Sequence, residues 1–210
     1  MKRLSKVKIE WSAKFSYAVG LMATDGNLSK DGRHMDMTSK DEEMILSFKE
    51  CFGIKNKIGR KSRGGSKEKR YFRIQFGDKN FYNFLLSIGF TPTKSKTLGR
   101  LMIPCEYFAD FLRGCIDGDG NIRIAKHPES QYPQLRISLY SASPLFLRWI
   151  KDEILKLVCP SGGWIGQDRN IEVLHYAKSD SIKLLNFIYY SRELFCLNRK
   201  YIIAEPFLRT

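Results

Sequence analysis

Two segments of this chain share one pattern, and both end in an Asp-Gly pair followed by asparagine. The first reads "YAVGLMATDGNL" and the second reads "FLRGCIDGDGNIRI". Alignment of the two segments pairs Asp25 with Asp119, Gly20 with Gly114 and Asn27 with Asn121. An internal repeat decides the architecture before any single element does. Two copies in 210 residues predict two pseudosymmetric halves and not a solenoid of many units.

Both segments predict a helix that stops at the Asp-Gly pair. Ser12 suits the N-cap of the first helix, and Pro104 suits the opening turn of the second. The glycine after each aspartate is expected at the C′ position. Both copies then continue in the same predicted order: strand, strand, helix, strand, strand, helix. We therefore expect an N-terminal half over residues 1–96, a linker over 97–104 and a C-terminal half over 105–210.

The charge balance indicates a polyanionic partner. Lys and Arg number 36 against 22 for Asp and Glu, which gives a formal net charge of +14. Such a field attracts nucleic acid first and an anionic membrane surface second. No apolar stretch approaches the ~20 residues that cross a bilayer, so a membrane is not expected as a partner.

The five cysteines are scattered and never form a Cys-x-x-Cys pair. This spacing favours neither a disulfide framework nor a zinc site. No secretory signal is evident at the N-terminus. We therefore expect an intracellular, reducing compartment, such as the cytoplasm, the nucleoid or an organelle matrix.

The paired segments resemble the LAGLIDADG homing endonucleases in their single-chain form. "GLMATDGNL" and "FLRGCIDGDGNI" stand at the family's signature positions, and "GFTPTKSKTL" and "CLNRKY" resemble the stretches that close each half. The resemblance implies an α+β fold of two pseudosymmetric αββαββα halves. Each half would contribute a four-stranded antiparallel sheet, and the two sheets would form a DNA-binding saddle in a monomer.

The resemblance also implies that the two motif helices cross. Gly20 and Gly114 would lie at the helix interface, where the absence of a side chain lets two backbones approach closely. Asp25 and Asp119 would then lie side by side at two helix C-termini. Two carboxylates and two negative dipole ends repel each other without a cation. An ordinary pair of helix C-caps without a metal remains the simpler alternative.

The implied cation is Mg²⁺, with Mn²⁺ or Ca²⁺ able to replace it in binding. Mg²⁺ favours oxygen ligands from one or two carboxylates together with phosphate and water. The implied ligands are Asp25 and Asp119, with the backbone carbonyls of Thr24 and Gly118 as further donors. Such metals activate water and stabilise the leaving oxygen in phosphodiester hydrolysis.

The first copy departs from the family pattern at one position. Ala23 stands where the second copy has Asp117, the earlier acid of the motif. In this family the earlier acid usually has a structural capping role. The resemblance therefore assigns the chemistry to the later acids, which both copies retain.

The resemblance places one lysine near each active centre, where its charge can polarise water or stabilise phosphate. The candidates are Lys94 in the first half, with Lys96 as the alternative, and Lys200 in the second. Asp36 and Ser138 occupy corresponding places on the second strand of each half. Family members often carry a polar residue there that orders water in the active site.

Polar and basic side chains spread along the predicted strands and hairpin tips are candidates for DNA contact. Strands fit the major groove as ribbons with alternate side chains toward the bases. The candidates are Asn27, Arg60, Lys61, Arg63, Lys67, Lys69, Arg70, Arg73 and Gln75 in the first half, and Asn121, Arg123, Lys126, Gln134, Arg136, Gln167, Arg169, Asn170 and His175 in the second.

The sequence therefore favours a Mg²⁺-dependent, site-specific endonuclease that cuts both strands of DNA at a long target. Two alternatives have the same fold. One is a maturase that binds intron RNA, and the other is a DNA-binding regulator that has lost cleavage. Retention of both motif acids argues against the regulator and is compatible with a maturase.

Overall fold

The computed structural model describes residues 5–62, 68–127 and 130–208, with only the backbone described at 126, 127 and 130–133. The first half contains α1 (Ala13–Thr24), β1 (Gly26–Leu28), β2 (His34–Ser39), α2 (Glu42–Cys51), β3 (Ile58–Lys61), β4 (Tyr71–Gly77), α3 (Lys79–Ser87) and the 3-10 helix η1 (Lys94–Lys96). This order agrees with the order that the sequence predicts for the first copy.

The second half repeats the order and extends it. It contains η2 (Cys105–Tyr107), α4 (Phe108–Asp119), β5 (Gly120–His127), β6 (Ser130–Ser141), α5 (Pro144–Val158), β7 (Trp164–Asp168), β8 (Ile171–Tyr176), α6 (Lys178–Ile188), α7 (Asn198–Ala204) and η3 (Glu205–Phe207). Helix α7 has no place in the predicted order. In the described part of the chain, no helix is both long and apolar enough to span a bilayer.

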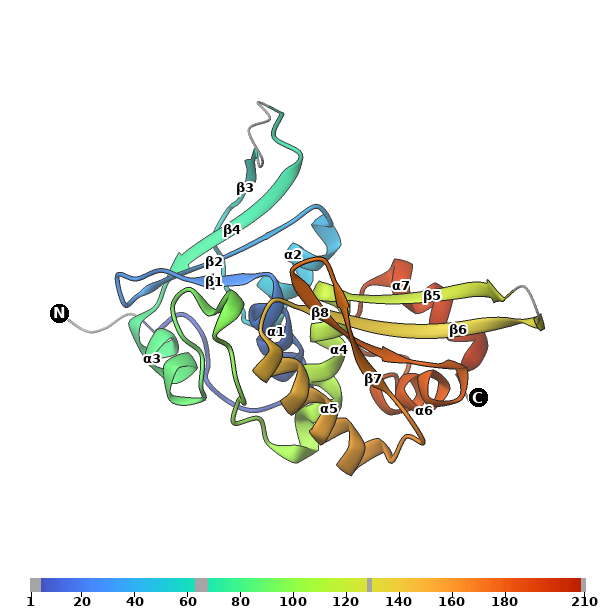
Figure 1. Ribbon diagram of the computed structural model, residues 1–210. Helices are drawn as coiled ribbons and strands as arrows, with labels where there is room; N and C mark the ends of the chain where they lie inside the picture. Colours follow the sequence, from blue (N-terminus) through green and yellow to red (C-terminus); the bar gives the residue numbers. More distant parts are fainter. Residues whose placement is uncertain (1–4, 63–67, 128–129, 209–210) are drawn as a thin grey trace.

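The two halves lie side by side, with α1 and α4 at the centre of the molecule (Figure 1). Each half has a four-stranded antiparallel sheet, in the order β1-β2-β4-β3 and β5-β6-β8-β7. The fold is therefore α+β with two similar halves, as the sequence predicts. Figure 1 also shows the β3–β4 hairpin rising from one half and the β5–β6 hairpin extending from the other.

The helices α1 and α4 touch through their backbones. A Cβ atom at Gly20 would lie 2.2 Å from the carbonyl oxygen of Phe111, and one at Gly114 would lie 2.1 Å from that of Tyr17. Real Cβ atoms do not approach backbone oxygen so closely. The glycine pair therefore permits a helix contact that any side chain would prevent.

The glycines that follow the motif acids have a different role from the one expected. Neither Gly26 nor Gly120 has the positive φ of a left-handed C′ residue, and Gly120 is extended at φ −98°. A Cβ at Gly26 would instead lie 2.7 Å from the Met22 carbonyl oxygen, and one at Gly120 would lie 2.5 Å from that of Ile116. Close packing of the first strand onto the helix end, and not a left-handed turn, requires glycine.

Each sheet has one face packed on helices and one face turned away from them. In β4, Ile74 and Phe76 are buried in the core while Gln75 between them is exposed. Because residues directly opposite each other in an antiparallel pair share a face, the register assigns every other strand residue to one side. We call the side away from the helices the groove face.

The α1–α4 contact predicts a large stability difference between glycine variants. Gly20→Ala or Gly114→Ala forces the two helices apart, and we expect a loss of about 2 kcal/mol or more in unfolding free energy, measured by urea denaturation. Gly99→Ala is the control, because nothing lies within 4 Å of its added Cβ. Equal stability of all three variants would contradict the close contact.

Candidate active site and groove

Asp25 and Asp119 occupy corresponding positions at the ends of the crossing helices. Asp25 is the C-cap of α1, and Asp119 is the last residue of α4. A Cβ at Gly118 would lie 2.9 Å from Asp25 Oδ2, so the Asp25 carboxylate lies against the last turn of α4. Both carboxylates also lie close enough to Lys94 for their charges to raise its pKa. The structure therefore brings acids from both halves to one junction.

Lys94 is buried beside the end of α1. Its Nζ donates to the carbonyl oxygens of Ala23 (2.6 Å) and Thr24 (2.9 Å). Burial lowers the Lys94 pKa to about 8, against the opposing charges of the two aspartates. Lys96, the alternative, is exposed to solvent. Lys94 is therefore the lysine of the first half that reaches the junction.

Lys200 has the corresponding place at the end of α4. Its Nζ donates to the carbonyl oxygens of Ile116 (2.5 Å), Asp117 (2.8 Å) and Gly120 (2.7 Å). Burial lowers the Lys200 pKa to about 8, with the Asp117 charge acting in the opposite direction. Carbonyls at a helix C-terminus lack intrahelical donors and carry partial negative charge. The two lysines satisfy these carbonyls, which is a contact that the sequence does not reveal.

Thr24 and Gly118 are both engaged in the helix contact. The Thr24 carbonyl accepts the Lys94 bond, and its hydroxyl donates to the Leu21 carbonyl oxygen (3.1 Å). A Cβ at Gly118 would lie 2.0 Å from Thr24 Oγ1. Gly118 therefore makes room for Thr24 and Asp25. This packing role is additional to the metal-binding carbonyl that the resemblance implies.

The earlier motif acid is a buried structural residue. Asp117 is fully buried, and its Oδ2 accepts bonds from the Tyr17 hydroxyl (2.9 Å) and the Leu197 backbone N–H (2.8 Å). Burial raises the Asp117 pKa to about 6. Since Leu197 is the N-cap of α7, Asp117 ties the helix that carries Lys200 to both motif helices. The first half has Ala23 at the corresponding position, which has no carboxylate to make such a link.

A buried ion pair that sequence reasoning missed secures the segment before α7. Arg113 is 1% exposed and pairs with Asp110 on the same helix. Its other donors reach the carbonyl oxygens of Ile188 (2.7 Å) and Phe195 (2.8 Å). The sequence signal for this ion pair is an arginine within an apolar helix. A charged side chain is rarely buried without partners, so Arg113 could have been expected to have one.

A cavity of about 220 Å³ lies beside the junction and is lined by both halves. Thr24 and Lys94 come from the first half, and Asp119, Tyr140 and Ile171 come from the second. The cavity therefore opens the junction at the ends of β6 and β8, where a substrate can approach the Asp119 carboxylate.

The oxygen donors at the junction fit Mg²⁺, Ca²⁺ or Mn²⁺ better than zinc or copper. Two carboxylates supply oxygen ligands, as Mg²⁺ prefers, and leave its remaining positions to water and phosphate. Within the described ranges, no group of three or more His, Cys, Asp or Glu side chains could hold a metal ion. Asp25 and Asp119 are the residues that would hold the ion.

The strand register places polar rows across both groove faces, next to the motif acids. In the first sheet the row is Asn27, Asp36 and Gln75, and in the second it is Asn121, Ser138 and His175. Asp36 accepts Arg73 Nε (2.7 Å) and forms an ion pair with that guanidinium. Ser138 Oγ lies 2.8 Å from His175 Nδ1. Asp36 and Ser138 therefore orient the side chains of Arg73 and His175 directly. These contacts are additional to the role in ordering water that the resemblance implies.

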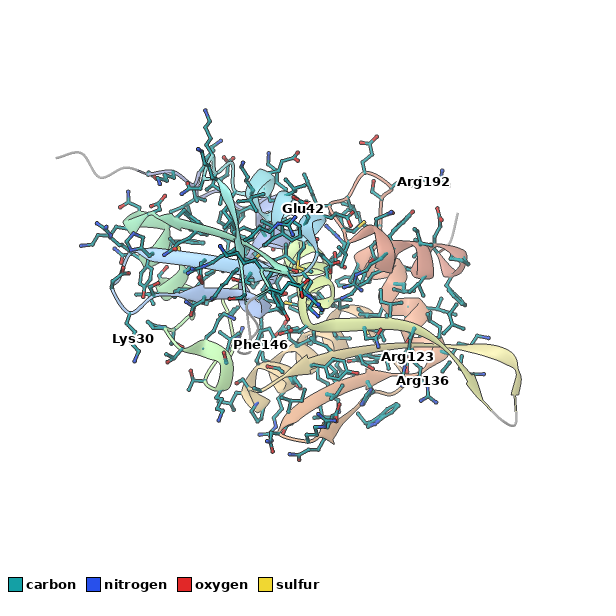
Figure 2. All side chains as sticks on the ribbon, turned by 90° about the horizontal axis from the view of Figure 1, so that it is seen from above. Lys30, Glu42, Arg123, Arg136, Phe146 and Arg192 are labelled. Atoms are coloured by element: carbon teal, nitrogen blue, oxygen red, sulfur yellow. The ribbon has the colours of Figure 1, made fainter. Side chains whose placement is uncertain are left out.

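Several other candidates lie on the groove face or at exposed hairpin ends. Arg123 and Arg136 are directly opposite each other on β5 and β6, where Figure 2 shows them together. The groove face also holds Lys61 and Gln134, and the exposed hairpin ends hold Lys69, Arg70, Arg169 and Asn170. Arg63 and Lys67 lie outside the described residues, as does the side chain of Lys126.

Two candidates for DNA contact lie on the opposite side of their sheets from the groove face. Arg60 is directly opposite Phe72 and stacks on its ring at 3.7 Å from the centroid. Gln167 is directly opposite Glu172. Leu174, two residues further along the same strand, faces the core, so Glu172 and Gln167 lie on that side of the sheet. The sequence could not predict this placement, because a strand alternates its faces at every residue and only the register reveals the phase.

Solved structures with the same architecture match nearly the whole chain. The homing endonuclease I-WcaI bound to its DNA recognition sequence matches with a TM-score of 0.64 at 11% identity, over 92% of this chain and 86% of that one. I-DmoI in complex with DNA and Ca matches with a TM-score of 0.58 at 15% identity, over 92% and 97%. A further I-DmoI complex contains DNA and Mn.

Full-length DUF199/WhiA from Thermatoga maritima matches with a TM-score of 0.57 at 16% identity. The match covers 96% of this chain but only 64% of that one. The separately solved N-terminal LAGLIDADG domain of DUF199/WhiA matches with a TM-score of 0.56 at 15% identity, over 95% of this chain and 98% of that one. This chain has the two-repeat LAGLIDADG fold. No family model and no curated protein matches it by sequence.

The Asp117 network predicts a difference between two tyrosine variants. Tyr17→Phe removes a donor from a buried carboxylate, so we expect a loss of about 1–3 kcal/mol in unfolding free energy, measured by urea denaturation. Tyr176→Phe is the matched control, since its buried hydroxyl has no hydrogen-bond partner among the described residues. The control should change stability by less than about 0.5 kcal/mol. Similar losses in both variants would contradict the proposed bond.

Proposed function

We propose that this protein is a single-chain LAGLIDADG homing endonuclease that hydrolyses both strands of a long, specific DNA site with a divalent metal. One observation carries the proposal. Acids from the two halves, Asp25 and Asp119, lie at one junction beneath two polar groove faces, and a buried lysine caps each helix end. A DNA-binding protein without cleavage would have no need for this pair of carboxylates.

The basic side chains on the groove faces and the net charge of the protein both support duplex binding. Arg73, Arg123 and Arg136 face the groove and can pair with phosphates or base edges. The formal net charge of +14 favours binding to a polyanion such as DNA. Mg²⁺ held by Asp25 and Asp119 would supply the charge that activates water and stabilises the leaving oxygen.

Lys94 and Lys200 would hold the two helix ends in place beneath the scissile phosphates. Each Nζ is committed to backbone carbonyls, so its first role is to neutralise the helix C-terminus. The positive charge that remains on each lysine also favours an incoming phosphate.

The test uses a randomised duplex library, because the target sequence is unknown. The protein is incubated with the library and Mg²⁺, and newly formed ends are captured and sequenced. We expect staggered double-strand cuts at one related set of sequences, and no cuts when EDTA removes the metal.

Two variants locate the chemistry. Asp25→Asn and Asp119→Asn should each reduce cleavage at least about a hundredfold, since each removes a charge at the reacting phosphate. Both should still bind the selected duplex in Ca²⁺. Asp152→Asn, an exposed change in α5, is the matched control and should cut normally. Specific duplex binding without cleavage would favour the regulator, and specific binding of intron RNA alone would favour the maturase.

A further inference from the structure

The groove faces of the two halves differ at corresponding positions. The registers of the two sheets pair Asp36 with Ser138, Gln75 with His175, Arg73 with Val173 and Gly59 with Gly166. The first half has an ion pair between Asp36 and Arg73 at these positions, whereas the second has Ser138, His175 and the buried Val173. The side chains that could contact a base edge therefore differ chemically between the two halves.

His175 is held on two sides. Its Nδ1 lies 2.8 Å from Ser138 Oγ, and Trp164 on the edge strand β7 stands directly opposite it. The ring centroids of Trp164 and His175 are 5.1 Å apart, and Trp164 is 49% exposed. The imidazole is fixed in this position, with its Nε2 edge away from the serine.

The imidazole is the neutral form. Burial lowers the His175 pKa, and the nearby charges of Arg123 and Arg136 lower it further. When the Ser138 hydroxyl donates to Nδ1, the single ring proton resides on Nε2. His175 then presents one N–H donor to the groove.

Gly166 leaves a recess next to this donor. A Cβ placed there would lie 3.6 Å from His175 Nε2 and 3.9 Å from Trp164 Cδ1. These are ordinary van der Waals distances, so the absent side chain leaves the space over the Gly166 Cα open and bordered by both rings. Its walls are the indole edge and the imidazole edge.

We propose that His175, Trp164 and Gly166 form a subsite that reads one thymine in the major groove of the bound DNA, which rests on the proposed function. Thymine presents the O4 acceptor next to its C5-methyl group, and no other base has both. The Nε2–H of His175 donates to O4. The methyl group enters the recess at Gly166 and contacts Trp164.

The first test compares three proteins on a randomised duplex library in Ca²⁺. Wild type, Gly166→Ala and Gly59→Ala each select sequences, with Gly59 as the matched position in the other half. Neither glycine has a positive φ, and neither added Cβ lies under 3.4 Å from another atom, so both variants should melt like wild type. We expect Gly166→Ala to lose the preference for thymine at one position, and Gly59→Ala to keep it.

The second test removes only the methyl group. Replacement of that thymine by deoxyuracil should weaken wild-type binding about fourfold, the worth of one buried methyl. Gly166→Ala should bind the two duplexes equally, and Gly59→Ala should keep the fourfold difference.

The outcomes separate the two proposals. If wild type enriches no sequence, the proposed function fails. If it enriches a sequence but Gly166→Ala leaves every position unchanged, or deoxyuracil binds as well as thymine, the thymine subsite alone is overturned. Trp164-dependent binding of a single-stranded RNA that exceeds duplex binding would also overturn it, since the ring would then stack on an unpaired base.

Discussion

The contact of α1 and α4 through Gly20 and Gly114 is the constraint on which the site depends. It brings two helix C-termini together, and with them two sets of carbonyls without donors and two negative dipole ends. Asp25 and Asp119 add charge of the same sign. The buried lysines answer this electrostatic problem, because each places a positive charge on one helix end. Burial lowers the pKa of both lysines, so part of their stabilisation is spent on desolvation.

The two halves solve the same problem with different supports. Lys94 lies on η1 within the first half, whereas Lys200 lies on the separate helix α7. The first N–H groups of α7 need acceptors, and Asp117 and Glu43 supply them to Leu197 and Asn198. Since Glu43 belongs to the first half, α7 braces the two halves against each other. This difference explains why the earlier motif acid is present in one copy and replaced by Ala23 in the other.

The repeated motif was sufficient to predict the order of elements, because that order follows from local pattern and duplication. The expectation that Asp25 and Asp119 lie side by side came instead from the resemblance to the LAGLIDADG family. What the pattern could not supply was relative placement. The side of the sheet on which Arg60 and Gln167 lie could not be predicted, because strand phase depends on pairing with a neighbour. The bond from Tyr17 to Asp117 depends on how α1 and α4 are rotated against each other. No residue spacing within either helix carries that information.

The unequal groove faces constrain the DNA that this protein could recognise. Arg73 is held by Asp36 and keeps donors for a base edge, and such a fork matches the two acceptors of guanine. Val173 stands at the corresponding place in the other half, where it is buried and has no donor. A palindromic duplex would present the same base edge to both positions and could satisfy only one of them. Under the proposed function, duplication of the fold preserves the two-fold geometry of cleavage, while divergence of the groove residues makes the preferred site asymmetric.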